Sequence, residues 1–427
     1  MNRRLALWVP LVAMLFVARA ARGQGAAEVT IGYQGLPYKA SGESNTGIQV
    51  SEGVLLHVGA GAEAGYDTNV FYANVDPIAS PMIRTSVFGD LSNATRTGAA
   101  GRISFDARAG VVYRRYQSDD AAVEPFRNAW MPTAGLALSA GGGQFGFGIA
   151  DTFARLEDPP YNSGPQVPIT RYNNQASAEG RWAPGGGRIT ATLRYTNMVD
   201  IFQGGYSYAS TDGNYLMLDG SWKWLPKTAI FLNAQQGYIF YLNQAEADAN
   251  NKVSSYPLVV TAGLRGLLTE KTSATVAVGY TNGFYTGGLS TGGAWGSTYL
   301  DLSAALRPSM LSRIVAGYRH DLQNAVVASF SYNETVYASY VQQIAGRLAL
   351  DLSARYSHRN YGGSFVDPVQ MTIGRTDNFV QLGATLDYFV RNWIYAGVGY
   401  SLLSNGSNIP SVEYLKQQMF VRLGLTY

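Results

Sequence analysis

The sequence contains no cysteine among its 427 residues, and only 14% of its residues are Asp, Glu, Lys or Arg. The lack of cysteine excludes a disulfide scaffold, a Cys-based zinc site and a lipidated N-terminal cysteine. The charged fraction is well below the roughly 25% usual for soluble globular domains. Long apolar runs are also missing beyond the N-terminus, which excludes a polytopic helical protein, because each span needs about 20 apolar residues.

Aromatic side chains and glycine, in contrast, are abundant. The chain has 29 Tyr, 17 Phe, 7 Trp and 49 Gly. So many aromatic side chains present too much burial-seeking surface for a disordered chain. A composition rich in aromatics and glycine, poor in charge and without helical spans is typical of a transmembrane β-barrel.

The first 20 residues have the pattern of a secretory signal peptide. Arg3 and Arg4 form a positive start, residues 5–18 are apolar, and small residues stand at positions 18 and 20. This apolar core is too short to span a bilayer comfortably, so we expect export with cleavage near residue 20. Loss of these two arginines and of Arg19 lowers the net charge from +3 to 0, and nothing then favours a nucleic-acid partner. Residues 21–51 are polar and glycine-rich, which predicts a periplasmic leader or, alternatively, a plug for the lumen.

From about Val54 onward the dominant pattern is an alternation of apolar and polar residues. In the stretch 347–356, Leu348, Leu350 and Leu352 share one face of a strand, and the charged residues share the other. Several stretches hold this pattern for ten or more residues, whereas ordinary strands average about five or six. A tilted membrane strand needs about 9–11 residues, so the alternation predicts that residues 52–427 form a barrel.

Short turn signals alternate with longer polar segments, which is the asymmetry of a membrane barrel. With both chain ends on one side, the short turns predict an all-β, antiparallel, up-and-down barrel of about 18 strands, with 16 as the alternative. The longer polar segments are residues 157–174, 203–214, 244–255, 286–294 and 359–377. The short turns lie near Asn93, Gly142, Gly186, Pro226, Thr269, Pro308, Gln343 and Arg391.

The final residues form an alternating strand in which Leu423, Leu425 and the aromatic Tyr427 share one face. This pattern resembles the terminal strand that the outer-membrane assembly machinery recognises. The resemblance implies that this machinery is a partner and that the barrel is integral to the bacterial outer membrane, in contact with its lipid.

A narrower resemblance lies in residues 62–71, where Tyr66, Asp67 and Asn69 precede an aliphatic and an aromatic residue. This segment resembles the opening motif of the outer-membrane β-barrel porin 2 family, and the hairpin from Tyr395 to the end is similar to that family's last hairpin. The resemblance implies an exit conduit for a secreted polysaccharide, with periplasmic polysaccharide export components as partners. Asp67 and Asn69 have a structural interpretation too, because Asp and Asn cap backbone groups at strand ends.

The polar side of each predicted strand gives the candidate lumen wall. Acidic and basic side chains are mixed there, so they either pair across strands to brace the wall or present a wet surface along which a hydrated cargo slides. The candidates are Asp106, Arg108, Arg194, Asp219, Lys223, Asp301, Arg347, Asp351, Arg355 and Asp387.

Catalytic motifs are scarce. There are three histidines, and no HExxH, P-loop or GxSxG pattern occurs. We therefore expect no catalytic site, cofactor or metal, and a passive, non-catalytic channel. Three alternatives remain open at this point: a general diffusion porin for small solutes, an outer-membrane hydrolase that uses His320 or His358, and a structural or adhesive barrel without transport. The adjacent His320 and Asp321 are the one candidate pair for such chemistry.

Overall fold

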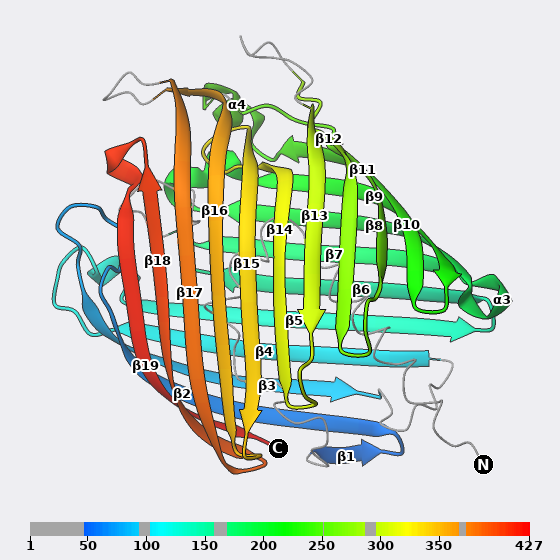
Figure 1. The fold of residues 1–427 in the computed structure, drawn as a ribbon. Helices are drawn as coiled ribbons and strands as arrows, with labels where there is room; N and C mark the ends of the chain where they lie inside the picture. Colours follow the sequence, from blue (N-terminus) through cyan, green and yellow to red (C-terminus); the bar gives the residue numbers. More distant parts are fainter. Residues whose placement is uncertain (1–46, 94–102, 158–168, 251, 287–295, 367–372) are drawn as a thin grey trace.

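The computed structural model describes residues 47–93, 103–157, 169–250, 252–286, 296–366 and 373–427. The predicted signal peptide and most of the predicted leader lie outside the described residues. The described chain is a single closed sheet (Figure 1). Among the described residues, no helix is both long enough and apolar enough to cross a membrane.

Eighteen antiparallel strands, β2 to β19, each pair with their neighbours in the sequence, and β19 pairs with β2 to close the ring. The predicted up-and-down barrel of 18 strands is therefore confirmed. The strands are β2 (Val54–Asp67), β3 (Ser80–Ser92), β4 (Ile103–Tyr116), β5 (Asn128–Gly142), β6 (Phe145–Leu156), β7 (Arg171–Trp182), β8 (Ile189–Phe202), β9 (Thr211–Leu225), β10 (Thr228–Tyr241), β11 (Leu258–Leu267), β12 (Thr272–Asn282), β13 (Gly296–Leu306), β14 (Ser312–Asn324), β15 (Phe330–Ile344), β16 (Leu348–Val366), β17 (Ile373–Arg391), β18 (Ile394–Ser407) and β19 (Tyr414–Thr426).

A further short strand, β1 (Ile48–Ser51), lies inside the segment predicted as a leader. It pairs with the start of β2, where Ile48 is opposite Leu56. β19 ends its ladder with β2 at the pair Thr426–Gly59. β1 thus continues the sheet on the edge of β2 that β19 leaves uncovered.

The connections at one end are mostly short, as the turn signals predict: those after β5, β7, β9, β11, β13, β15 and β17 have two to six residues. The predicted short turn near Asn93 is instead a connection of ten residues between β3 and β4, and at the opposite end the connections after β14, β16 and β18 have only five or six residues. The turn after β7 holds α3 (Pro184–Gly187), in which the φ angles of Gly185 and Gly186 are +60° and +69°, a conformation that favours glycine. The connections at the other end carry the short helices η1 (Glu124–Phe126), η2 (Gly204–Ala209), α4 (Gln244–Ala249) and η3 (Pro410–Val412).

One predicted loop is a hairpin in the structure. Residues 359–377 were expected to form a long polar segment, but β16 continues to Val366 and β17 begins at Ile373, with 19 residues in each strand. The polar residues of the two strands pair with each other, Arg359 opposite Asp377. A strand that rises beyond the membrane needs no apolar face, so the loss of alternation there does not end the strand.

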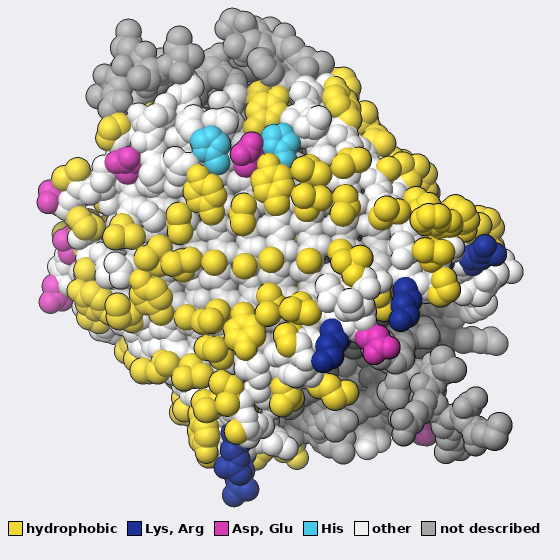
Figure 2. All heavy atoms as spheres, viewed as in Figure 1, with side chains coloured by type: hydrophobic (Ala, Val, Ile, Leu, Met, Phe, Trp, Pro, Cys, Tyr) yellow, Lys and Arg dark blue, Asp and Glu magenta, His cyan; other side chains and the backbone are white. Residues whose placement is uncertain are grey.

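The two faces of the barrel differ in chemistry, as the alternation predicts. Leu352, Leu382 and Leu386 project outward with 38%, 39% and 38% of their surface exposed. Figure 2 shows a broad belt of hydrophobic side chains on the outer face, with charged side chains toward its margins. The residues that alternate with these outward-facing side chains point into the lumen, and they carry most of the charged groups of the strands. Buried apolar clusters of the described residues involve the long connections, including one formed by Val70, Phe71 and their neighbours.

Candidate functional site: the lumen wall and its mouth

Charged side chains of the inner wall pair across neighbouring strands. The guanidinium of Arg194 on β8 donates through Nε to Glu179 Oε2 on β7 at 2.9 Å. Arg319 Nη2 on β14 lies 2.7 Å from Asp301 Oδ2 on β13. Directly opposed residues of an antiparallel pair share one face of the sheet, so these ion pairs brace the wall from inside the lumen.

A row of four charges with alternating sign crosses β17, β19, β2 and β3. Arg422 Nε donates to Asp387 Oδ1 at 2.7 Å, and Arg84 Nε lies 2.7 Å from Glu63 Oε2. The register places Arg422 opposite Glu63, which joins the two pairs. Gly397 on β18 lies between Asp387 and Arg422, and a Cβ there would stand 2.1 Å from Asp387 Oδ1. The glycine therefore leaves room for the ion pair to span β18.

The remaining predicted wall residues have different positions. Asp106 pairs with Arg108 along β4 itself, at 2.7 Å. Arg347 lies in the turn between β15 and β16, at the short-turn end, and so is not a wall residue. The alternation turns Asp219, Lys223, Asp351 and Arg355 inward. Their part in translocation stays a prediction.

Glu63, Arg84 and Glu179 were not among the predicted wall residues, yet each is half of an ion pair. Alternation along each strand places these three residues on the inner face. The register then sets Glu63 opposite Arg422 and Glu179 opposite Arg194. The signal was present in the sequence. Pairing across strands depends on the register, which the sequence pattern alone does not give.

Asp67 of the opening motif has a structural role. This carboxylate is fully buried at the end of β2, where Oδ2 lies 2.7 Å from Lys416 Nζ and 2.8 Å from Gln418 Nε2 on β19. The Lys416 ammonium also donates to the carbonyl oxygen of Asn69 at 2.8 Å. Asp67 thus ties the two strands that close the barrel.

Asn69 caps the loop that follows β2. Its Oδ1 accepts from the Ala73 amide at 2.8 Å, while its Nδ2 donates to the Ala73 carbonyl at 2.7 Å and to the Leu415 carbonyl at 3.1 Å. Asn69 is 1% exposed, so it offers no surface to a cargo. Tyr66 of the same motif is 48% exposed on the outer face. The geometry supports the capping interpretation of the motif.

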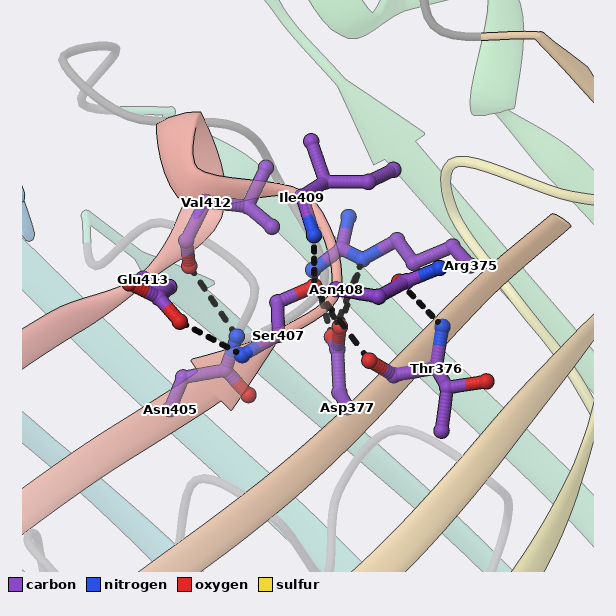
Figure 3. A network of polar contacts seen from close by, with 9 residues as sticks. All are labelled: Arg375, Thr376, Asp377, Asn405, Ser407, Asn408, Ile409, Val412 and Glu413. Atoms are coloured by element: carbon purple, nitrogen blue, oxygen red, sulfur yellow. Dashed lines mark hydrogen bonds and ion pairs between the residues drawn. The ribbon is translucent and has the colours of Figure 1, made fainter. Parts of the chain in front are cut away.

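A second buried polar network fixes the loop ends of β17 and β18 (Figure 3). Arg375 Nε donates to Asp377 Oδ1 at 2.9 Å, and the two side chains are 1% and 0% exposed. Ser407 Oγ donates to Asp377 Oδ1 at 2.7 Å and accepts from the Ile409 amide at 3.1 Å. Asn405 Nδ2 donates to the Val412 carbonyl at 3.0 Å. Together these contacts hold the connection that contains η3 against the barrel.

The long connections interlock across part of the mouth. Val326, between β14 and β15, packs against Ile169, Phe202 and Ala209 at the ends of β7, β8 and η2. These segments belong to strands about six positions apart around the ring, so the contact crosses the mouth rather than following its rim.

Lys252, in the connection between β10 and β11, fixes the same loop. Its Nζ donates to the carbonyl oxygens of Ala325 and Ala328, and the side chain is 1% exposed. Burial lowers the pKa of this amine to about 7. In the same region Ser207 Oγ of η2 donates to Glu246 Oε2 of α4 at 2.7 Å. Three connections are thereby held together.

The prediction that His320 and Asp321 could act together is wrong. His320 is opposite the outward-facing Leu300, whereas Asp321 is opposite Asn333 on the inner face. Adjacent residues of a strand project to opposite faces, so the barrel wall separates the two side chains. His358 also faces outward, opposite Glu334.

Sequence comparison gives no relative: no family model matches the chain, and no curated protein matches it. Solved structures with a similar fold include OccAB4 of Acinetobacter baumannii, at 12% identity over 87% of this chain and 98% of that chain, with a TM-score of 0.46. The siderophore receptor PirA of Acinetobacter baumannii matches at 7% identity over 87% and 80%, with a TM-score of 0.44. The FrpB iron transporter of Neisseria meningitidis matches at 9% over 82% and 62%, with a TM-score of 0.43.

The closed ring of strands, the apolar outer belt and the asymmetric connections decide where the chain resides. It is an integral outer-membrane β-barrel. Its short turns then face the periplasm and its interlocked long connections face the cell exterior, which is the usual orientation of such barrels.

Proposed function

We propose that this outer-membrane barrel is a passive conduit for a hydrophilic cargo. The observation that carries the proposal is the polar, ion-paired inner wall inside an apolar exterior. Such a wall exchanges hydrogen bonds with a hydrated cargo while the paired charges keep the barrel shape. Conduction of this kind needs no covalent chemistry and no cofactor. The direction of flow is then set by a gradient or by periplasmic partners.

For the cargo we propose a secreted polysaccharide, delivered by periplasmic export components. Two observations support this choice: the resemblance of residues 62–71 to the β-barrel porin 2 family, and the connections that interlock across the mouth. A partly covered mouth suits a dedicated exit for one cargo. A general diffusion porin for small solutes is the second candidate, favoured by charges of both signs that stand exposed in the wall, such as Arg108 at 63%.

A deletion strain tests the cargo. We expect cells without the gene to bind less of a polysaccharide-binding dye at their surface, and the intact gene to restore binding. Uptake of a small sugar, measured in the same strains, is the matched control and should stay unchanged. Normal dye binding together with slower sugar uptake would contradict polysaccharide export and favour the diffusion porin.

A further inference from the structure

His320 and Glu334 stand side by side on the outer face of β14 and β15, and Ser297 meets His320 at the edge of β13. Ser297 Oγ lies 2.9 Å from His320 Nε2, and His320 Nδ1 lies 3.8 Å from Glu334 Oε1. A hydroxyl within hydrogen-bond reach of a base, with the base oriented by a third group, is the arrangement that activates a nucleophile. Nothing in the proposed conduction uses these three side chains.

The strand register explains how the three groups meet. His320 and Glu334 are directly opposite on the outer face. The pairing of β13 with β14 ends at Leu300–His320, three residues short of Ser297. Ser297 stays paired with the inward-facing Thr281 of β12 and shares the lumen side with Asp301, but the β14 side of β13 is no longer paired there. The hydroxyl therefore reaches the His320 ring from the edge of its strand.

The site lies at the depth of a membrane interface. Tyr318 and Tyr356 stand on the same outer face one outward position closer to the periplasm than His320 and His358, and outward aromatic rows mark the interface of a membrane barrel. Figure 2 shows two histidines and an acidic side chain at the upper margin of the hydrophobic belt. His320 is 22% exposed and Glu334 is 54% exposed, so a molecule in the outer leaflet can reach them.

A candidate hydrogen-bond donor for a developing oxyanion stands on the neighbouring strand β12. The Tyr280 hydroxyl accepts from Asn282 Nδ2 at 2.6 Å, and a hydroxyl that accepts a hydrogen bond can also donate its own proton. A Cβ on Gly296 would stand 2.2 Å from this hydroxyl, so the phenol lies against the residue that precedes Ser297. Donors aimed at the place where charge develops are the second requirement of acyl transfer.

We propose that Ser297, His320 and Glu334 form a lipid-facing site that cleaves acyl esters of membrane lipids. The Ser297 oxygen attacks the ester carbonyl while His320 takes the hydroxyl proton, and the tetrahedral oxyanion accepts a hydrogen bond from Tyr280. The bond to the alcohol then breaks, and His320 returns the proton to the leaving oxygen. Water, activated by His320, hydrolyses the acyl-serine, so one ester and one water give one acid and one alcohol.

The substrate class follows from the position of the site. His320 and Glu334 face outward, and Ser297 meets His320 at the strand edge, so an ester is expected to approach from the surrounding lipid beside the aromatic row and not from the lumen. The activity is independent of conduction, and either proposal stands without the other.

The test uses the full-length barrel in detergent micelles, with p-nitrophenyl butyrate and an acyl-labelled phosphatidylethanolamine as probes and a fluorophosphonate as the covalent label. We expect the fluorophosphonate to attach to Ser297 and the wild type to hydrolyse both esters. Ser297→Ala should lower hydrolysis by about 100-fold or more, the scale of losing a nucleophile. Ser303→Ala, a serine of the same strand that faces the lumen, should behave like the wild type.

Folding is checked for each variant by the change in electrophoretic mobility on heating. Folded wild-type protein that neither hydrolyses the esters nor takes up the label would overturn the proposal. Hydrolysis that persists unchanged in folded Ser297→Ala, or a label found on another residue, would overturn it equally.

Discussion

Replacing Leu352 with arginine is expected to prevent assembly of the barrel, whereas replacing its neighbour Ser353 with arginine is expected to be tolerated. Leu352 faces outward, four residues beyond Leu348 and four before Tyr356 on β16, and so lies near the middle of the apolar belt. An arginine on the lipid face near the midplane costs about 2–4 kcal/mol. Ser353 projects into the aqueous lumen, where the same charge stays hydrated.

The two variants differ only in the face of the strand that carries the new arginine, because the depth, the strand and the introduced residue are the same. The measurement is the amount of folded barrel in outer-membrane fractions, read from the mobility shift on heating. Equal losses for Leu352→Arg and Ser353→Arg would contradict the assignment of the two faces.

The second large effect is expected at the closing seam. Asp67→Ala leaves the Lys416 ammonium buried without its carboxylate, since the two side chains are 0% and 2% exposed and 2.7 Å apart. Removing one partner of a buried ion pair costs about 3–5 kcal/mol. We expect the free energy of unfolding in urea to fall by that order, with β2 and β19 separating at lower denaturant concentration.

The control is the double variant Asp67→Asn with Lys416→Met, which removes both charges at once. Replacing both partners of a buried pair is often close to neutral, so this variant should recover much of the stability lost in Asp67→Ala. Single and double variants that unfold at the same urea concentration as the wild type would show that this pair does not hold the seam.

The sequence predicted the barrel well because each membrane strand is specified locally. Alternation sets which side chains face lipid, and turn residues such as Gly185 and Gly186 set where strands reverse. The hairpin of β16 and β17 escaped prediction above Arg359, where polar residues such as Asn360 and Thr376 stand opposite each other on the outer side and the alternation is lost. A strand outside the membrane is held by its pairing, which no single segment reveals.

The candidate sites were predicted less completely, because they depend on contacts between distant segments. The interlocked mouth rests on Val326, which packs against the cluster that contains Ile169, and on Lys252, which donates to the carbonyl of Ala325. No periodicity in the sequence couples these segments. His320 was a candidate residue of a hydrolase, but its contact with Ser297 was not predicted, because alternation along β13 assigns Ser297 to the lumen and only the end of the ladder at Leu300 lets it reach His320.

Single-channel conductance in a planar lipid bilayer tests the proposed conduit most directly. The wild type is compared with a variant in which residues 325–328 are replaced by an Asn-Gly turn, which removes Val326 and the carbonyls that hold Lys252. We predict discrete conductance steps for the wild type and larger steps for the variant, because its mouth is less covered. Folded barrels of both forms that insert without any conductance would contradict the account.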